Sequence, residues 1–182
     1  ELIFLNGGFL EISEQQRLNL ATYAIALGAD VERTCSLLSW REFEEVAAIA
    51  FAANGYQVKR NVRFKHEGQR YEVDVLGFKK PVILCADCKH WYRMGWSNVE
   101  RIVEKHVERI YAFAEYITSF ADKLGLASWG TFKVFPVVLS LISSRFKFCK
   151  GVPVVPILQL QNFLSQMSAC IEDLKYFEKS VA

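Results

Sequence analysis

The most informative segment of the chain reads Val82-Ile83-Leu84-Cys85-Ala86-Asp87-Cys88-Lys89. It is apolar almost throughout, which is typical of a strand buried on both faces at the centre of a sheet. Asp87 and Lys89 interrupt that pattern, and because they are two positions apart, their side chains project from the same face. Buried charges are costly unless they pair or bind a metal. This local violation of the pattern therefore indicates a candidate functional site.

Two further strands are expected before this segment, because apolar and polar residues alternate there with period two. The expected order is strand 56–64, hairpin turn 66–69, strand 70–76 and turn 77–81. On the second strand, Tyr71, Val73 and Val75 are expected on one face, with Glu72 and Asp74 on the other. Since hairpin-connected strands lie side by side, Asp74 can lie beside Asp87.

The remaining segments complete a mixed α/β fold. Ser39-Trp40-Arg41-Glu42 is a capping box that predicts a helix over 40–54, ended by Gly55. Further expected elements are a helix from Ser97 or Asn98 to about 123, strands 132–140 and 152–157, and a final helix 158–178. From Ser39 on, the order is α-β-β-β-α-β and then β-α. We therefore expect one sheet flanked by helices over residues 39–182.

An N-terminal helical segment, residues 1–38, precedes this domain. Helical spacing runs from 13 to 38 with an interruption at Gly28-Ala29-Asp30, so two short helices are expected. They can form a DNA-reading helix-turn-helix or simply pack on the main domain. The second helix carries only Arg33 as a basic reader, which favours packing.

Composition restricts the class of protein. The chain has 182 residues, of which 52% are hydrophobic and 23% charged, as in folded globular proteins. Its apolar runs are shorter than the roughly 18 residues that span a bilayer, and its start lacks the pattern of a secretory signal. Five cysteines, an odd number, favour reduced thiols in a cytoplasmic protein. Cys85 and Cys88 are three apart on a strand and point to opposite faces, so a zinc site is not expected.

Basic charge is concentrated in one segment. Residues 57–93 carry nine Lys or Arg against four Asp or Glu, a net of +5, which leaves −3 for the rest of a chain whose net charge is +2. Such a segment can face a polyanion, or it can be an ordinary solvated hairpin. The candidate phosphate contacts are Lys59, Arg60, Arg63, Lys65 and Arg70. Trp91, Tyr92 and Arg93 are further candidates, for stacking on or clamping nucleic acid.

The carboxylates suggest a metal site. Asp74 and Asp87 repel each other when close, and a divalent cation relieves that repulsion. Hard oxygen ligands suit Mg²⁺ or Mn²⁺, which would activate a water and offset charge on a phosphate. Lys89 could orient that water or stabilise developing charge, and Glu44 of the helix 40–54 could add a ligand. This chemistry is phosphodiester hydrolysis; the alternative is a structural Asp87–Lys89 ion pair.

Three motifs in order resemble the Mrr-like restriction endonucleases of the PD-(D/E)xK superfamily. They are Phe43-Glu44-Glu45-Val46 before Gly55-Tyr56-Gln57-Val58, then Tyr71-Glu72-Val73-Asp74-Val75-Leu76, then Leu84-Cys85-Ala86-Asp87-Cys88-Lys89. The resemblance covers about Ser39 to Ile142. It implies a restriction-endonuclease-like αβββαβ core and a Mg²⁺-dependent DNA endonuclease, often a homodimer. It also implies that Glu44, Asp74 and Asp87 hold the metal beside Lys89.

The sequence departs from that family pattern at two positions. Val73 stands where the motif has Pro, and Asp87 replaces the commoner Glu, which shortens the ligand arm. Glu42 and Glu45 compete with Glu44 for the helix ligand, and Glu44 is preferred because Glu42 is used in the capping box. A catalytically inert, DNA-binding form of the nuclease fold is the main alternative, and a scaffold whose charges merely pair is a third hypothesis.

Two histidines are weaker candidates for the site. His106 falls on the apolar stripe of the helix after the third strand, so a core histidine is favoured over one lining the site with Arg109. His66 lies in a turn and is expected to be solvated.

Overall fold

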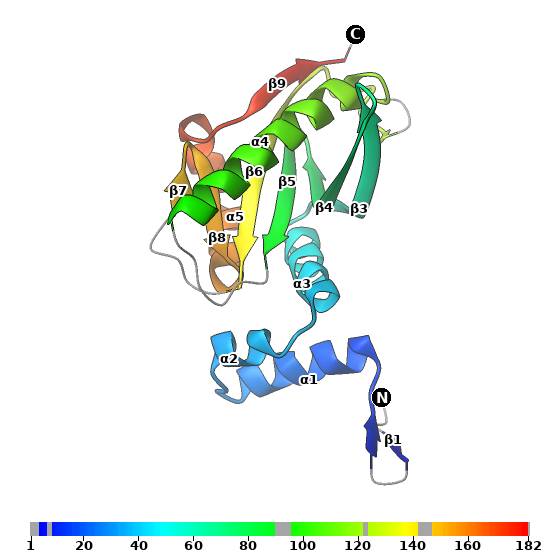
Figure 1. Ribbon diagram of the computed structural model, residues 1–182, viewed down its shortest axis with the longest axis vertical. Helices are drawn as coiled ribbons and strands as arrows, with labels where there is room; N and C mark the ends of the chain where they lie inside the picture. Colours follow the sequence, from blue (N-terminus) through cyan, green and yellow to red (C-terminus); the bar gives the residue numbers. More distant parts are fainter. Residues whose placement is uncertain (1–3, 7–8, 90–95, 122–123, 142–146, 182) are drawn as a thin grey trace.

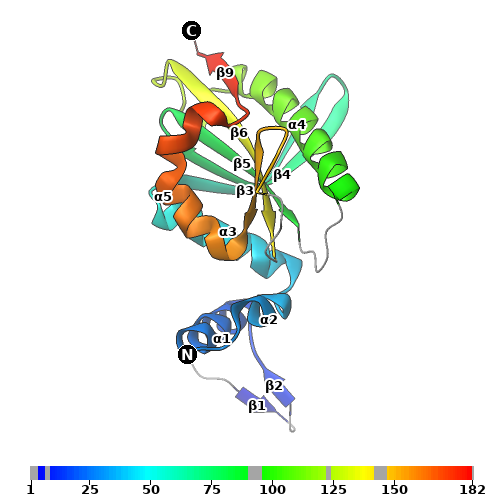
Figure 2. The same cartoon turned by 90° about the vertical axis from the view of Figure 1, so that its left-hand side faces the viewer.

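A computed structural model of the chain describes residues 4–6, 9–89, 96–121, 124–141 and 147–181. Its centre is a mixed sheet of seven strands in the order β3-β4-β5-β6-β8-β7, with β9 also paired to β6 (Figure 1). Helix α4 covers one face of the sheet, and α3 and α5 cover the other (Figure 2). The mixed α/β fold and the order α-β-β-β-α-β are thus confirmed.

The strands of the sheet are β3 (Gln57–His66), β4 (Gln69–Lys79), β5 (Val82–Lys89), β6 (Thr131–Ser140), β7 (Phe148–Cys149), β8 (Val152–Pro156) and β9 (Phe177–Ser180). The helices are α1 (Glu14–Ala26), α2 (Val31–Ser36), α3 (Trp40–Ala53), α4 (Trp96–Thr118) and α5 (Leu160–Cys170). Strand β4 pairs antiparallel with both β3 and β5, whereas β5, β6 and β8 are parallel. The expected central position of β5 is confirmed.

Helix α3 begins and ends as the sequence predicts. The Ser39 side chain accepts a hydrogen bond from the Glu42 backbone N–H, and the Glu42 side chain accepts one from the Ser39 N–H. The helix ends at Ala53 with Asn54 as its C-cap, and Gly55 follows with φ of +79°, a left-handed conformation that glycine adopts without strain. These caps fix where α3 starts, and hence which of its residues face the sheet.

The turn expected at 77–81 is wrong in its first three residues. Strand β4 continues to Lys79, and Gly77 pairs with Leu84 of β5. A side chain at Gly77 would place its Cβ 2.6 Å from Cδ2 of Phe51 in α3. The glycine therefore marks the close approach of helix and sheet, rather than a turn.

Strand β4 changes character around Asp74. Val73 packs in the cluster on the α4 side of the sheet, but Val75 packs in the cluster on the α3 side. The expectation that these two valines share a face is therefore wrong. Asn61, across from this point on β3, has a positive φ of 51°, and the β4–β5 pairing runs only from Lys79–Val82 to Val75–Ala86. The two strands separate just where Asp74 and Asp87 lie.

The end of the chain also differs from expectation. In place of one helix over 158–178, a 3₁₀ turn (Ile157–Gln159), α5 and a second 3₁₀ turn (Ile171–Asp173) lead into β9. Strand β9 pairs antiparallel with Thr131–Val134 of β6, a long-range pairing that overrides the local helical pattern. Helix α4 ends at Thr118 rather than near 123. Strand β7 and a small hairpin of β1 (Phe4–Asn6) and β2 (Phe9–Glu11) were not expected.

The N-terminal helices contact α3 directly. The expected interruption at 28–30 separates α1 from α2. Leu18, Cys35 and Leu38 are buried in the same cluster as α3. Arg17 donates to the Leu37 carbonyl at 2.7 Å and forms an ion pair with Glu42 at 2.9 Å. The packing role is thus observed, and a DNA-reading role for Arg33 stays a prediction. Within the described ranges, no helix is both long and apolar enough to cross a membrane.

Candidate functional site

A cleft of about 530 Å³ opens where β4 and β5 separate. Asp74 of β4 lines it together with Asp87 and Lys89 of β5. The other walls are Trp40 at the start of α3, the hairpin residues Gln69 to Glu72, and Lys105, Glu108 and Arg109 of α4. Three of the four predicted catalytic residues therefore share one cleft.

Asp87 is held by two cations. Its Oδ2 lies 2.9 Å from Nζ of Lys89, and its Oδ1 accepts a hydrogen bond from Nη1 of Arg109 at 2.8 Å. Burial alone would raise the pKa of this carboxyl, since it is only 2% exposed, but the interactions with His106, Lys89 and Arg109 outweigh that effect and the pKa is lowered. Asp87 is thus a stable carboxylate at the base of the cleft.

Asp74 has a different environment. Its Oδ2 accepts a hydrogen bond from the backbone N–H of Cys88 at 2.7 Å, which ties β4 to β5 at the point where their ladder has ended. Burial, and then the nearby charge of Asp87, raise the pKa of Asp74 to about 6, although the hydrogen bond from Cys88 opposes the rise. A cation in the cleft would favour the ionised form of this carboxyl.

Glu44 lies on α3 and is only 5% exposed. Burial, and then the charge of Asp74, raise the pKa of Glu44 to about 7. Its side chain lines a neighbouring depression of about 860 Å³, together with Arg60 and Asn61, rather than the cleft itself. Glu44 is therefore electrostatically coupled to Asp74, but it does not share a cavity with Asp87.

The donor set limits how a metal could be held. Among the described residues, no three of His, Cys, Asp and Glu converge closely enough to hold a metal ion. Mg²⁺ commonly uses only one or two carboxylates and takes its other ligands from water and substrate phosphate. Asp74 and Asp87, two buried carboxylates of one cleft, fit that requirement. Because Lys89 and Arg109 occupy both oxygens of Asp87, one of these contacts must loosen for Asp87 to act as a ligand.

His106 is a core residue, as expected. Its Nε2 lies 2.9 Å from the Cys85 carbonyl oxygen, so this nitrogen carries the proton of the neutral ring. Burial lowers the pKa of His106 to about 4. At neutral pH the ring is therefore uncharged.

Arg109 contacts the site directly, although the sequence indicates it only as a weaker candidate beside His106. Its position three residues after His106, on the same side of a helix, was the available signal. Only the structure shows that this side of α4 crosses the C-terminal end of β5, and so brings the guanidinium to Asp87.

The predicted phosphate contacts are dispersed along β3 and β4. Lys59, Lys65 and Arg70 are exposed. Arg60 forms an ion pair with Glu45, and Arg63 forms one with Glu72 at 2.9 Å. The candidates Trp91, Tyr92 and Arg93 lie outside the described residues.

The fold and the site define a mixed α/β protein with a carboxylate–lysine cleft at the separated ends of two central strands. The chain belongs to the same family as an uncharacterized protein of Archaeoglobus fulgidus, to which it is 30% identical over 132 residues, 71% of this chain and 92% of that protein. No protein-family model matches the chain.

Three solved structures have partial similarity to the chain. The small subunit of the heterodimeric restriction endonuclease R.BspD6I has a TM-score of 0.42 at 12% identity, covering 85% of this chain and 78% of that one. Protein VC1899 from Vibrio cholerae has a TM-score of 0.43 at 13% identity, covering 90% and 46%. A protein of unknown function, AF1548, has a TM-score of 0.37 at 16% identity, covering 56% and 46%. At scores below 0.5, these similarities establish neither activity nor site.

Proposed function

We propose that this protein is a metal-dependent nuclease that hydrolyses phosphodiester bonds in DNA. The observation that supports the proposal best is the common cleft of Asp74, Asp87 and Lys89, which come from two strands that separate there. Two buried carboxylates and one lysine, open to solvent between a helix and a hairpin, form a set suited to a cation and a phosphate.

In this proposal Asp74 and Asp87 would hold Mg²⁺ or Mn²⁺, and Glu44, which lines the neighbouring depression and is coupled to Asp74, would add a ligand on the Asp74 side. When bound, the ion lowers the pKa of a coordinated water and offsets negative charge on the phosphate. Lys89 orients the attacking water or stabilises the charge that develops on the phosphate oxygens. Lys89 is well placed for this role, because Asp87 fixes its ammonium at 2.9 Å beside the cleft.

Arg109 has a role in the metal-free protein, where it pairs with Asp87. Its guanidinium neutralises Asp87 in the metal-free protein and so keeps a buried carboxylate from being unpaired. Since a guanidinium also suits phosphate oxygens, Arg109 is a second candidate for binding the substrate backbone in the cleft.

The substrate and assembly belong to the same proposal. Lys59, Arg60, Arg63, Lys65 and Arg70 would contact the DNA backbone, which predicts an affinity that falls steeply with salt. A homodimer is expected, since it would present two clefts to the two strands of a duplex.

The direct test is a cleavage screen over duplex, flap, branched and single-stranded DNA with Mg²⁺, Mn²⁺ or EDTA. We expect products only with metal, and none from Asp87→Ala, Asp74→Ala or Lys89→Ala proteins that still melt cooperatively. Undiminished cleavage by Asp74→Ala and Lys89→Ala would exclude this site as the source of activity.

A second candidate is a DNA-binding protein with an inert cleft. It is favoured by one observation, the occupation of both Asp87 oxygens by Lys89 and Arg109. It predicts DNA binding that is indifferent to metal, no cleavage of any substrate in the screen, and a greater loss of affinity in Arg33→Ala than in Asp87→Ala.

A further inference from the structure

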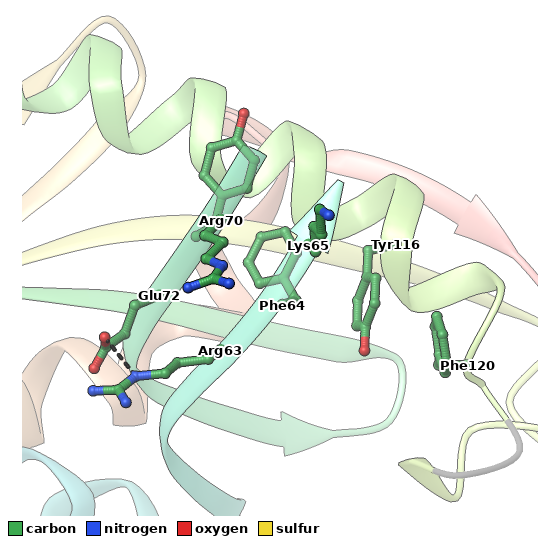
Figure 3. Close-up of a pocket in the computed structure, with 8 residues that line it drawn as sticks. Arg63, Phe64, Lys65, Arg70, Glu72, Tyr116 and Phe120 are labelled. Carbon is green, nitrogen blue, oxygen red and sulfur yellow. Dashed lines mark hydrogen bonds and ion pairs between the residues drawn. The ribbon is translucent and has the colours of Figure 1, made fainter. Parts of the chain in front are cut away.

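The β3–β4 hairpin exchanges its two faces partway along its length. Toward the hairpin turn, Phe64 of β3 and Val73 of β4 pack on the α4 side of the sheet. Figure 3 shows this side, where the Phe64 ring lies 5.1 Å from that of Tyr116 in α4. Toward the other end of the hairpin, Val58 of β3 and Val75 of β4 pack on the α3 side instead. Within each strand the two residues are an even number of positions apart, so an uninterrupted strand would place both on one face.

Asn61 of β3 and Asp74 of β4 lie opposite each other where the faces are exchanged. The hairpin register pairs the residues on either side of Asn61 with those on either side of Asp74, but it omits the pair between them. Asn61 has a φ of +51° although it lies within a strand. A residue in this left-handed region is a feature of β-bulges, which bend a strand and re-aim its side chains. The backbone outlier thus coincides with the exchange of faces.

At this irregularity the Asp74 side chain is directed toward β5. Its Oδ2 accepts a hydrogen bond from the backbone N–H of Cys88 at 2.7 Å, and strand N–H groups lie in the plane of the sheet. The side chain of an uninterrupted strand stands roughly perpendicular to that plane. The β4–β5 register, continued by one residue beyond Val75–Ala86, places Asp74 level with Asp87. The carboxylate therefore enters the cleft along the sheet rather than from one of its faces.

The conformation of Asn61 is not explained by burial of its own side chain, because Asn61 is exposed. Asparagine tolerates a positive φ better than most residues do. Backbone outliers persist where the surrounding structure holds them, and they are frequent at active sites. The side-chain amide also interacts with Glu44, which lines the same depression. A role of Asn61 can therefore depend on its backbone or on its amide.

We propose that Asn61 is a positioning residue, whose left-handed backbone exchanges the faces of the hairpin and so directs the Asp74 carboxylate into the cleft. The inference rests on the proposed nuclease function for its catalytic consequence, the placement of a metal ligand. Its geometric part concerns only the contact between Asp74 and β5, which exists without metal or DNA.

Three substitutions separate the backbone of Asn61 from its side chain. Asn61→Gly removes the amide but adopts a positive φ without strain. Asn61→Val disfavours a positive φ strongly, because its side chain is β-branched. If Asn61→Val does not fold, Asn61→Ala imposes a smaller strain of the same kind and takes its place. The proposal predicts that Asn61→Gly resembles the wild type and that Asn61→Val does not.

Hydrogen exchange of the Cys88 amide in EDTA reports the Asp74 contact without any cleavage. The exchange rate of Cys88 is divided by that of Leu84, a fully buried residue of the same strand, to separate a local effect from a change in global stability. In Asn61→Val this ratio should rise about tenfold, because the hydrogen bond to a carboxylate is lost. In Asn61→Gly it should stay within about twofold of the wild type.

Steady-state cleavage of DNA in Mn²⁺ gives a second measurement. Asn61→Val should lower kcat about hundredfold and leave KM within about twofold, because the metal ligand is misplaced while contacts to the DNA remain. Asn61→Gly should restore kcat to within about threefold of the wild type. A loss of general stability would not be reversed by glycine, which is the more flexible residue.

Glu67→Val is the matched control. Glu67 has a positive φ of 47° in the turn of the same hairpin, and it is not among the residues that line the cleft. Its replacement imposes the same kind of backbone strain away from Asp74. Both the exchange ratio and kcat should therefore stay within about twofold of the wild type.

Three outcomes would overturn the proposal. The first is an equal loss in Asn61→Gly and Asn61→Val, which would assign the role to the amide beside Glu44. The second is an unchanged exchange ratio in Asn61→Val. The third is an effect of Glu67→Val as large as that of Asn61→Val. If the wild type cleaves no DNA, the nuclease proposal fails, and the exchange ratios still decide whether Asn61 positions Asp74.

Discussion

The two parts of β5 lie in one strand, but they have opposite chemistry. Val82 to Ala86 is apolar, buried and paired with β4 on one side and β6 on the other. Asp87 to Lys89 keeps its partner in β6, but the β4–β5 ladder has already ended, and two of its three residues are charged. The charged residues of β5 therefore lie only where β4 no longer pairs with it.

This difference shows how a core strand can carry a polar site. In the closed part of β5, Val82 to Ala86, where β4 still pairs with it, unpaired charges would be desolvated with no compensation. In the open part, Asp87 gains Lys89 and Arg109, and Asp74 gains the Cys88 N–H that would otherwise belong to the ladder. The closed part is therefore expected to determine stability and the open part activity.

The largest expected effect is on activity, from the open part. Lys89→Ala should lower the cleavage rate about a thousandfold, equivalent to roughly 4 kcal/mol of transition-state stabilisation. The ammonium is partly exposed, so unfolding in urea should show only a small loss of stability. Single-turnover cleavage in Mn²⁺ would measure the rate.

Lys79→Ala is the matched control, because Lys79 is exposed at the closed end of the same strand pair. Its cleavage rate should stay within about twofold of the wild type. Similar rate losses in both variants would mean that the open part of β5 has no special role.

The next effect is on stability, from the closed part. Leu84→Ala empties a fully buried position between Gly77 and Phe135 and should lower the free energy of unfolding by about 3 kcal/mol. The fraction that remains folded should cleave at the wild-type rate. A stable Leu84→Ala protein without activity would contradict the expectation that the closed part of β5 determines stability and the open part activity.

A smaller effect is expected from Gly77→Ala. The new methyl group would lie 2.6 Å from Phe51 Cδ2 and 3.1 Å from Tyr56 Cδ1, so the helix and sheet must move apart. We expect a loss of about 2 kcal/mol by chemical unfolding. The double variant Phe51→Leu, Gly77→Ala should lose less than the sum of the two single changes, because both act on one contact. Strict additivity would argue against the contact.

The smallest effect concerns pH. Because burial raises the pKa of Glu44 to about 7, the folded protein holds its proton to higher pH than the unfolded chain. Stability is therefore lost as pH rises from the ordinary pKa of Glu toward 7, and Glu44→Gln should recover about 1 kcal/mol at pH about 8 but little at pH about 4.5. Urea unfolding in EDTA at both pH values would measure this.

Glu14→Gln is the matched control for that measurement. Glu14 is exposed and lines the same depression as Glu44, so its replacement removes a carboxylate without altering a buried position. An equal gain from Glu44→Gln at both pH values would show that Glu44 is not destabilised by its charge.

Periodicity and caps were enough to predict most of the fold. The capping box of α3, the β3–β4 hairpin and the central strand β5 all depend on residues close in sequence, where local preferences act. Strand β9 could not be predicted in this way, because its partner in β6 lies more than forty residues earlier. Gly77 was misleading for a related reason. A glycine is needed there because Phe51 of α3 packs against its backbone, and not because the chain turns.

The site was predictable to the extent that strand geometry controls it. Asp87 and Lys89 share a face by alternation, and Asp74 follows from the hairpin. The approach of Arg109 depends on how α4 crosses the sheet, which periodicity does not specify. The Glu44 side chain lines a different depression, which forms where α1 packs beside α3. This contact between distant segments is also not specified by periodicity.

Strand β9 has a consequence for solubility. It covers the side of Thr131 to Val134 that β8 does not reach, since β8 pairs only with Val138 to Ser140. Without Phe177 to Ser180, part of β6 would present unpaired backbone groups next to Phe132 and Val134. Such an exposed, apolar strand edge is a template for pairing with another chain. A protein truncated before Phe177 should therefore aggregate. Residues Phe177 to Ser180 thus prevent β6 from pairing with a strand of another chain.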